Sequence, residues 1–254
     1  MTAQLADAHV HIDMYLGRDG VLDRAVAAGV TPVVVSTRPS EYRNLTTVLA
    51  GRGETLQLAL GFHPEAAGSV YSPSELAILE SLFAGARWIG EIGLDAVIGQ
   101  SIGSFFGNAP TLAEQTKALE RILALGVGDK VLSVHSRGAE AQAVEMLQEA
   151  GARGVMLHWY RGDRATASRA LDLGYLLSVN IAMLEDQAGK ELLAWLPSNG
   201  LLLETDGPFT ETDGSASEPR DVRALATRLA AFRGDDLEAL ENALAANFAR
   251  LVAA

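Results

Sequence analysis

Short apolar runs recur along the chain, and each is followed by a longer segment whose apolar residues have helical spacing. The runs predict eight strands, at residues 6–12, 31–36, 56–60, 87–93, 130–136, 154–159, 175–181 and 200–206. Strands that read as nearly continuous apolar runs are typical of a parallel sheet that is covered on both faces.

The segments between these strands have the pattern of amphipathic helices, most clearly at residues 111–126 and 139–151. Glycine stands between a helix and the following strand, where a left-handed residue ends a helix, at positions 29, 126, 151 and 174. Eight such units predict an α/β fold, a (β/α)8 TIM barrel, with its active site at the C-terminal ends of the strands. A doubly wound open sheet is the alternative, but it does not need this number of units.

The composition is that of a globular protein, with 48% hydrophobic and 20% charged residues. No linker, low-complexity tract or repeat divides the sequence, so we expect a single domain over residues 1–254. The absence of cysteine excludes disulfides, thiolate ligands and a cysteine nucleophile. The sequence shows no secretory signal and no apolar run near ~18 residues, so we expect a cytoplasmic protein without membrane contact.

The charge balance changes what this protein can bind. It has 20 basic and 32 acidic side chains, a net charge of -12 and a pI of about 4.8. Proteins that hold nucleic acid by their general field are usually basic, so that mode of binding is excluded. Any polyanion must be met by local features such as metal ions, a few arginines and backbone dipoles.

Two histidines stand close together in the string "DAHVHID" near the start of the chain. His9 and His11 are two residues apart, so on a strand their side chains share a face. This pair alone leaves open whether the residues bind a metal or simply end a strand. Four further polar residues occupy the ends of the fourth, fifth, sixth and eighth predicted strands: Glu91, His135, His158 and Asp206.

In a barrel the strand ends surround one opening, so these six residues become neighbours. Burying even one such group without a partner is costly, and six separate accidents are a poor explanation. Four imidazoles and two carboxylates suit Zn, Mn, Ni or Fe, and Mg less well. Six ligands are too many for one tetrahedral ion, so we expect two divalent metal ions, with Mg, Mn and Zn as the choices.

A bridge between two such ions is often a carbamylated lysine, but no lysine ends a strand in that way. The lysines are Lys117, Lys130 and Lys190. Glu91 is the natural bridge instead. Two ions ~3.5–4 Å apart activate water and neutralise a leaving oxygen, so the expected chemistry is hydrolysis. Asp206 is then a ligand and the acceptor for the nucleophilic water, while Glu204 either orients or deprotonates that water or only fills a buried layer.

Seven strings resemble, in order and spacing, the TatD family of metal-dependent deoxyribonucleases. They are "HVHID", "GFHPE", "GEIGLD", "VHSR", "LHWYRG", "SVNIAML" and "LETDGPF", and "NFARL" resembles the closing motif of the family. The resemblance implies a TIM barrel of the amidohydrolase superfamily that uses two divalent ions to hydrolyse DNA. The activity it implies is typically exonucleolytic, on single-stranded or duplex ends.

When the metal ligands of the family are matched to this sequence residue by residue, the resemblance implies two metal sites that share a ligand. The first metal would be held by His9, His11, Glu91 and Asp206, and the second by Glu91, His135 and His158. His63, in "GFHP", matches a non-ligand histidine near the scissile phosphate. The alternative is that His63 is a loop residue without a role.

Within the family, four strings look most like the TatD-type member of the Qat anti-phage defence systems of bacteria. They are "GEIGLD", "SVNIAML", "ETDGPF" and "SEPRDV". Because those systems contain several proteins, this resemblance implies protein partners and a role in defence against phage.

The rim of the expected barrel carries cations and aromatic rings. Arg38, Arg137 and Arg161 follow the second, fifth and sixth predicted strands. Guanidinium groups match phosphate oxygens well, although an ordinary salt bridge on the rim is an equal alternative for each. Tyr160 is expected with these arginines among the substrate-binding residues, and Tyr15 and Trp159 share the rim.

A glycine-rich segment at residues 96–110 follows the fourth predicted strand and departs from the family pattern. It contains Phe105 and Phe106, whose rings could stack on an unpaired base for ~1–3 kcal/mol. Core packing or contact with a partner protein is the preferred alternative for this pair.

The leading hypothesis is therefore a two-metal deoxyribonuclease. One rival is an amidohydrolase or esterase for small molecules, which would not need the rim of arginines and aromatic residues. The other rival is a metal-stabilised scaffold within a protein assembly, which would not need a bridging carboxylate.

Overall fold

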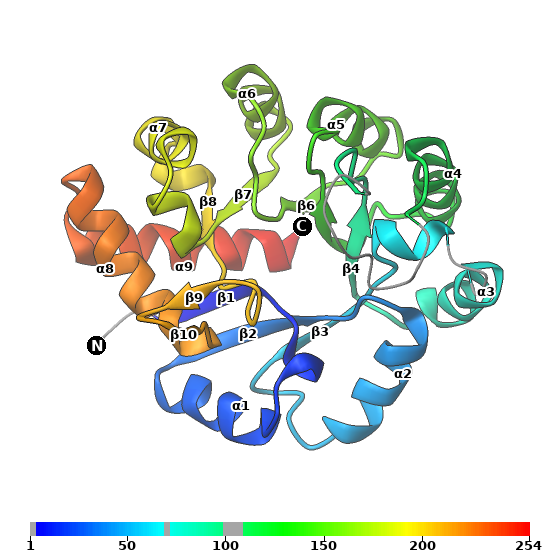
Figure 1. Cartoon of the computed structure of the whole chain (residues 1–254), viewed down its shortest axis with the longest axis horizontal. Coiled ribbons are helices and arrows are strands. Elements are labelled where there is room, and N and C mark those ends of the chain that lie inside the picture. The colour runs from blue at the N-terminus through cyan, green and yellow to red at the C-terminus, as the bar shows by residue number, and fades with distance from the viewer. Residues whose placement is uncertain (1–3, 69–71, 99–108) are drawn as a thin grey trace.

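Eight strands form a parallel sheet in chain order, as the sequence pattern predicts. The computed structural model describes residues 4–68, 72–98 and 109–254. The strands are β1 (Leu5–Val10), β2 (Val30–Val35), β3 (Gln57–Leu60), β4 (Trp88–Gly93), β5 (Val131–His135), β6 (Gly154–Leu157), β7 (Leu176–Val179) and β8 (Leu201–Leu203). Each strand pairs with the next one along the chain (Figure 1).

Helices follow the strands and surround the sheet (Figure 1). They are α1 (Arg18–Ala27), α2 (Pro39–Val48), α3 (Ser72–Phe83), α4 (Leu112–Leu123), α5 (Glu140–Glu149), α6 (Arg164–Asp172), α7 (Gln187–Trp195), α8 (Val222–Arg233) and α9 (Leu237–Ala253). Helices α4 and α5 confirm the two clearest helical patterns, and the glycines at 29, 126, 151 and 174 all have positive φ. Among the described residues, no helix is long and apolar enough to cross a bilayer.

Short elements occupy several of the loops. They are the 3-10 helices η1 (Ile12–Met14), η2 (Pro64–Gly68), η3 (Ile181–Leu184), η4 (Ser198–Gly200) and η5 (Pro219–Asp221), and a hairpin of β9 (Glu211–Thr212) and β10 (Ser215–Ala216). Elements η1, η2, η3 and the hairpin follow β1, β3, β7 and β8. They therefore lie at the C-terminal end of the barrel, where the sequence places the site.

Hydrogen bonds join the first strand to the segment after the last strand, so the barrel is nearly closed. The backbone N–H of Asp206 donates to His9 O and that of His11 donates to Gly207 O, both at 2.9 Å. An open doubly wound sheet has no such contacts between its outer strands, so the alternative fold is excluded.

The carboxylate of Asp7 strengthens this closure. It is fully buried and accepts hydrogen bonds from Thr205 N at 2.8 Å and Thr205 Oγ1 at 2.5 Å. Burial raises the pKa of Asp7 well above its usual value, against the lowering effect of the Thr205 bonds. The sequence pattern did not single out Asp7, although it opens the string that contains His9 and His11.

Apolar side chains fill the N-terminal half of the barrel. Strands β1 to β8 contribute Ala8, Val33, Val35, Ala59, Trp88, Val131, Met156, Leu176 and Leu202 to one buried cluster. Helix α9, which contacts β1, β6 and β8, adds Leu251 and the partly buried Phe248. The ring of Phe248 stacks near that of Trp88, with 6.0 Å between centroids. Helix α9 thus seals this end with apolar groups, and the polar groups lie at the opposite end.

Six of the strands end one to three residues earlier than the sequence pattern predicts, and in three of them this moves a site residue off the strand. Strands β1, β6 and β8 end at Val10, Leu157 and Leu203, so His11, His158 and Asp206 lie in the turns that follow. Asp206 has a φ of 48° and Trp159, which follows His158, has a φ of 39°. These left-handed residues end the extended backbone and turn the chain at the barrel mouth.

The seal formed by α9 predicts a specific loss of stability. Leu251→Ala removes a side chain that is only 3% exposed and leaves a cavity, so the free energy of unfolding should fall by about 2–4 kcal/mol in urea titrations. The neighbouring Val252, 36% exposed, supplies the control, because Val252→Ala should change stability by no more than about 0.5 kcal/mol. An equal decrease in the free energy of unfolding in the two variants would contradict the role of α9 in closing this end of the barrel.

Candidate metal centre

A first group of side chains meets at the C-terminal end of the barrel. His9 Nε2 lies 3.3 Å from His11 Nε2. Asp206 Oδ1 lies 3.7 Å from His9 Nε2 and 3.5 Å from His11 Nε2. Glu91 Oε2 completes the group, at 3.6 Å from His9 Nε2 and 3.5 Å from His11 Nε2. The structure thus brings together the four residues expected for the first metal.

The distances that join the two ring nitrogens to each other and to the two carboxylates fit a small divalent ion, and His9, His11 and Asp206 form one group that could hold it. Ligands about 2.1 Å from a tetrahedral ion lie roughly 3.4 Å from one another, and the five distances above span 3.3–3.7 Å. Asp206 Oδ1 is buried and has no hydrogen-bond partner within the described ranges. A buried oxygen without a partner is costly, and a cation at this position would satisfy it.

A second group forms around the other oxygen of the same carboxylate. Glu91 Oε1 lies 2.7 Å from His135 Nδ1 and 3.0 Å from His158 Nε2. The two ring nitrogens are 3.2 Å apart. Glu91 therefore divides its two oxygens between the two groups, as the sequence suggested for a bridging residue.

Glycines on either side of Glu91 allow β4 to carry it at this depth. A Cβ atom at Gly90 would lie 2.7 Å from Ser133 Cβ on β5. At Gly93, where φ is 140°, a Cβ atom would lie 1.9 Å from His135 O. Side chains at either position would push β4 away from β5, so the motif "GEIG" is explained by close strand packing around the carboxylate.

Two histidines of the centre, His9 and His135, are held by a hydrogen bond through their second ring nitrogen, and a carboxylate lies near that of His158. The contacting atoms are Ser133 Oγ for His9 Nδ1 at 2.8 Å, Asp95 Oδ2 for His135 Nε2 at 2.9 Å, and Glu204 Oε1 for His158 Nδ1 at 3.5 Å. Contacts of this kind fix the orientation of a metal-binding ring and leave its other nitrogen directed at the ion. Here each opposite nitrogen faces Glu91.

Asp95 is a residue of the candidate site that the sequence pattern did not single out. Its carboxylate is 3% exposed, contacts His135 and accepts the backbone N–H groups of Val97 and Ile98 at 2.8 and 3.0 Å. Burial opposes ionisation, but His135 and the other hydrogen bonds hold the pKa of Asp95 at about 2. The sequence feature that could have identified Asp95 is its position in the motif "GEIGLD", four residues after Glu91.

Glu204 lies beneath the centre, next to His158. It is fully buried and accepts hydrogen bonds from Ser178 Oγ at 2.5 Å and from Asn180 Nδ2 at 3.2 Å. Its Oε1 also lies 3.5 Å from His158 Nδ1. Asn180, in the motif "SVNIAML", is a further residue of the site whose role the sequence did not indicate.

The electrostatics of the centre favour positive charge. Burial would raise the pKa of Glu91, but His63, His158 and His135 outweigh it and hold that pKa well below its usual value. Burial would likewise lower the pKa values of His11, His135 and His158, but nearby carboxylates raise all three. A group of residues that holds an ionised carboxylate and attracts protons is also one that attracts a cation.

His63 lies beside the second group, with its side chain 16% exposed. Its Nε2 is 3.5 Å from Glu91 Oε1, and its Nδ1 accepts the backbone N–H of Glu65 at 3.2 Å. Burial lowers the pKa of His63 to about 4, so the ring is neutral near pH 7. A neutral ring whose Nδ1 accepts a hydrogen bond carries its proton on Nε2, from which it can donate.

The three arginines of the rim all form ion pairs. Arg38 pairs with Glu41 at 2.6 Å, Arg137 with Asp95 at 3.0 Å, and Arg161 with Asp186 at 2.7 Å. Their side chains are 38%, 48% and 34% exposed, so each also faces solvent. Arg137 is coupled most directly to the centre, because Asp95 also contacts His135.

The structure does not bring Tyr160 to the rim, which corrects the expectation that it lies with the arginines. The left-handed Trp159 turns the chain after His158, and Tyr160 packs in the apolar layer between the strands and helices. Its side chain is fully buried, and its hydroxyl donates to Asp163 O at 2.8 Å. Phe105 and Phe106 lie outside the described residues.

The lysines lie away from the centre. Lys130 precedes β5, at the N-terminal end of the barrel, and its Nζ donates to Ala84 O at 3.4 Å. Lys117 and Lys190 are part of α4 and α7. A carbamylated lysine is therefore not part of this centre, in agreement with the sequence pattern.

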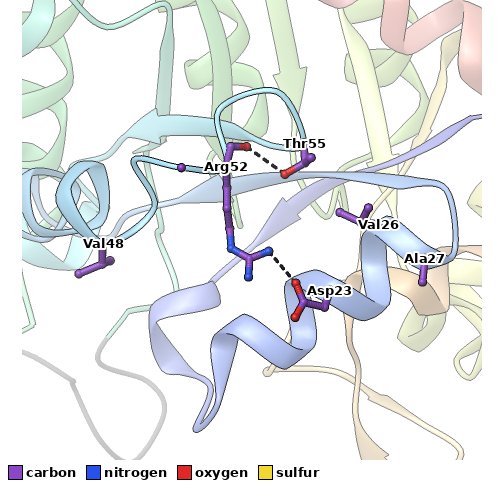
Figure 2. A pocket seen from close by; sticks show the side chains of 7 residues that line it. Asp23, Val26, Ala27, Val48, Arg52 and Thr55 are labelled. Carbon is purple, nitrogen blue, oxygen red and sulfur yellow. Dashed lines mark hydrogen bonds and ion pairs between the residues drawn. The ribbon is translucent and has the colours of Figure 1, made fainter.

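A separate hollow of about 610 Å³ lies between α1 and α2 (Figure 2). Its walls include Ala27 and Val48, near the helix ends that lead toward β2 and β3, so it opens at the N-terminal end of the barrel. Arg52 crosses it and pairs with Asp23 at 2.9 Å. The hollow is therefore remote from the metal centre.

Known proteins are similar to this chain in sequence and in fold. The family of TatD-related DNases matches residues 6–253. The metal-dependent hydrolase TatD of Mycobacterium tuberculosis is 32% identical over 240 residues, which cover 87% of this chain and 89% of that protein. The 3'-5' ssDNA/RNA exonuclease TatD of Citrobacter koseri is 27% identical over 237 residues, with 86% of each protein covered.

Among solved structures, YJJV, a TatD homologue from Escherichia coli K12, is 26% identical and superimposes with a TM-score of 0.84. The match covers 99% of this chain and 98% of that one. With the nearly closed barrel and the clustered histidines and carboxylates, these comparisons lead to one conclusion. The chain belongs to the family of TatD-related DNases and is a metal-dependent hydrolase.

Proposed function

We propose that this chain is a two-metal phosphodiesterase that degrades DNA from its ends, as one domain over residues 1–254 in the cytoplasm. The first ion would be held by His9, His11, Glu91 and Asp206, and the second by Glu91, His135 and His158. Mg, Mn and Zn are the candidate metals. A relative named as an ssDNA/RNA exonuclease and another named as a deoxyribonuclease support nucleic acid as the substrate.

The observation that carries the proposal is the divided carboxylate of Glu91. Its Oε2 belongs to the first group and its Oε1 to the second, so two adjacent cations can share one residue. A pair of divalent ions lowers the pKa of a water molecule and neutralises charge on the phosphoryl and leaving oxygens. That chemistry suits a phosphodiester, which is already anionic.

Asp206 is proposed to take the proton of the attacking water. Its Oδ1 is buried without a hydrogen-bond partner in the described part of the chain, and its left-handed backbone places it at the mouth. Attack of the water on phosphorus breaks the bond to the leaving oxygen, which takes up the proton held by Asp206 and departs as a hydroxyl, while the new P–O bond remains on the phosphate product. Glu204 orients His158 from below, which is a positioning role.

His63 and the rim arginines are proposed to bind the substrate. The Nε2–H of a neutral His63 can donate to a phosphoryl oxygen close to Glu91. Arg137, Arg38 and Arg161 would share their guanidinium groups between their present carboxylate partners and phosphates of the strand. Local contacts of this kind are required because the net charge is -12.

We also propose that the nuclease acts within a bacterial anti-phage defence complex of the Qat type. The support is the resemblance of four strings, including "SEPRDV" at residues 217–222. In the structure this string contains buried Ser217 and leads through η5 into α8, close to the segment that carries Asp206. The proposal implies partner proteins that meet this chain in the same complex.

The contact of Asp95 with His135 predicts selective weakening of the second site. Asp95→Asn should lower the affinity for the second ion by about 10- to 100-fold, because His135 loses its charged partner. Calorimetric titration of the metal-free protein with Mn²⁺ and with Zn²⁺ measures both binding steps. Glu145→Gln, which removes an exposed carboxylate on α5, is the control and should bind like the parent protein. Equal weakening of both steps would contradict the assignment.

Substitution of the two carboxylates tests the nuclease directly. Asp206→Asn and Glu91→Gln should each lower the cleavage of end-labelled single-stranded DNA by at least about 100-fold, because the proton acceptor or the shared ligand is lost. Thermal unfolding should show that both variants remain folded, and Glu145→Gln again serves as the control. Metal analysis of the purified proteins should show two ions in the parent and fewer in Glu91→Gln.

A substrate panel separates the nuclease from its enzymatic rival. The metal-loaded protein should degrade single-stranded DNA, duplex ends or RNA and leave simple amides and esters intact. Cleavage of amides or esters with intact nucleic acid would instead identify a small-molecule hydrolase.

The defence role makes a prediction in cells. Cells that express this chain together with its complete set of partner genes should lose protection against phage in plaque assays when the chain carries Asp206→Asn or Glu91→Gln. The reason is that hydrolysis is the proposed contribution of this chain. Glu145→Gln should protect fully. Full protection by both active-site variants would favour the scaffold role instead.

A further inference from the structure

An exposed aromatic ring stands beside the proposed first metal site. Phe209 follows Asp206 by three residues, and its side chain is 44% exposed. Its ring meets the ring of His11 edge to face, with 5.2 Å between centroids and an interplanar angle of 84°. The motif "ETDGPF" therefore contains both Asp206 of the centre and a phenylalanine that contacts His11.

Two other large apolar side chains are exposed at the same end of the barrel. Met14 is 37% exposed, and Leu16, in the loop after β1, is fully exposed at 103%. Isolated apolar groups on a surface need no explanation, but these residues follow the strand that carries His9 and His11. Three exposed apolar side chains, those of Met14, Leu16 and Phe209, thus lie in the segments that follow β1 and β8.

Phe209 also forms a wall of a hollow of about 510 Å³. The hollow lies between η3 and the hairpin of β9 and β10, and β9 contacts η3. Its charged lining residues are Glu185, Glu211, Asp213 and Arg228. Because Phe209 contacts the ring of His11 and also lines the hollow, it joins the hollow to the metal centre.

The charges of this hollow disfavour the phosphate of a nucleotide and permit its uncharged base. Three carboxylates face one guanidinium, and Arg228 already pairs with Asp213 at 2.6 Å. A second phosphate would be repelled here, whereas an uncharged base would meet an aromatic ring and hydrogen-bond acceptors. The sugar–phosphate chain must then leave the centre by another path, toward the rim arginines.

We propose that Phe209 stacks on the base of the nucleotide whose phosphate is cleaved, and that the adjoining hollow receives that base. The inference rests on the proposed function and deepens it, because it names the substrate as an unpaired end. A paired base must break its base pair before it can rotate out of the duplex and stack on a protein ring. An unpaired base can stack without this cost. Aromatic stacking accepts any base, so the platform selects for single-stranded character more than for sequence.

The test pairs a change in the protein with a change in the substrate. Phe209→Leu keeps an apolar side chain against His11 and removes the aromatic face, and Phe209→Tyr keeps that face. End-labelled single-stranded oligonucleotides carry either a normal base or an abasic site at the terminal nucleotide of each end. A phosphorothioate version, which resists hydrolysis, allows binding to be measured by fluorescence anisotropy.

Phe209→Leu should lower kcat/KM and affinity for the normal oligonucleotide by about 5- to 100-fold, the range expected for one lost stacking contact. The parent protein should show a similar decrease in kcat/KM and affinity when the substrate is abasic. Phe209→Leu should lower these values little further for the abasic substrate. Phe209→Tyr should behave like the parent. Phe232→Leu is the matched control, since Phe232 is 40% exposed on α8 and should leave all values unchanged.

Three results would overturn the inference. Equal losses by Phe209→Leu on normal and abasic substrates would show that Phe209 acts through His11, and metal analysis would reveal any lost ion. An unchanged Phe209→Leu would remove the platform altogether. If the metal-loaded parent cleaved no nucleic acid but bound normal and abasic oligonucleotides equally, the proposed function and the platform would both fail, whereas cleavage without base dependence would remove only the platform.

Discussion

One buried carboxylate organises the polar end of this barrel. Glu91 is 2% exposed, and the ring nitrogens that face it come from β1, β5 and the turns after β1, β3 and β6. Clustered imidazoles that bind protons repel one another, so the anion between them is what allows them to converge. The glycines of β4 and the partners of the histidine rings serve the same arrangement, because they set the depth of the carboxylate and the direction of the rings.

Much of this arrangement could be predicted because a barrel converts sequence order into position. Apolar runs locate the strands, and strand ends meet, so His9, Glu91 and Asp206 could be grouped although they are far apart in sequence. The turns were not predictable in the same way. Left-handed residues after the strands direct Tyr160 into the core and bring Asp95 back to His135. Neither placement follows from the period of a pattern, because each depends on backbone angles.

The charge of the protein is better understood from its distribution than from its sum. Each rim arginine already has an acidic partner, so the mouth is neither a basic funnel nor a bare acidic surface. A polyanion gains little from the general field at a net charge of -12. Recognition must therefore be short-range, through the centre itself, through guanidinium groups that exchange partners, and through uncharged parts of the ligand.

The contacts between Asp7 and Thr205, and between His9 and Asp206, join the beginning of the chain to a point near its end. Everything needed for the first group except Asp206 is synthesised early, yet the group cannot be completed until residue 206 has left the ribosome and found the first strand. A nascent or truncated chain lacks this ligand set whatever the metal supply. The architecture thus makes completion of this group depend on the docking of the last strand of the barrel against the first.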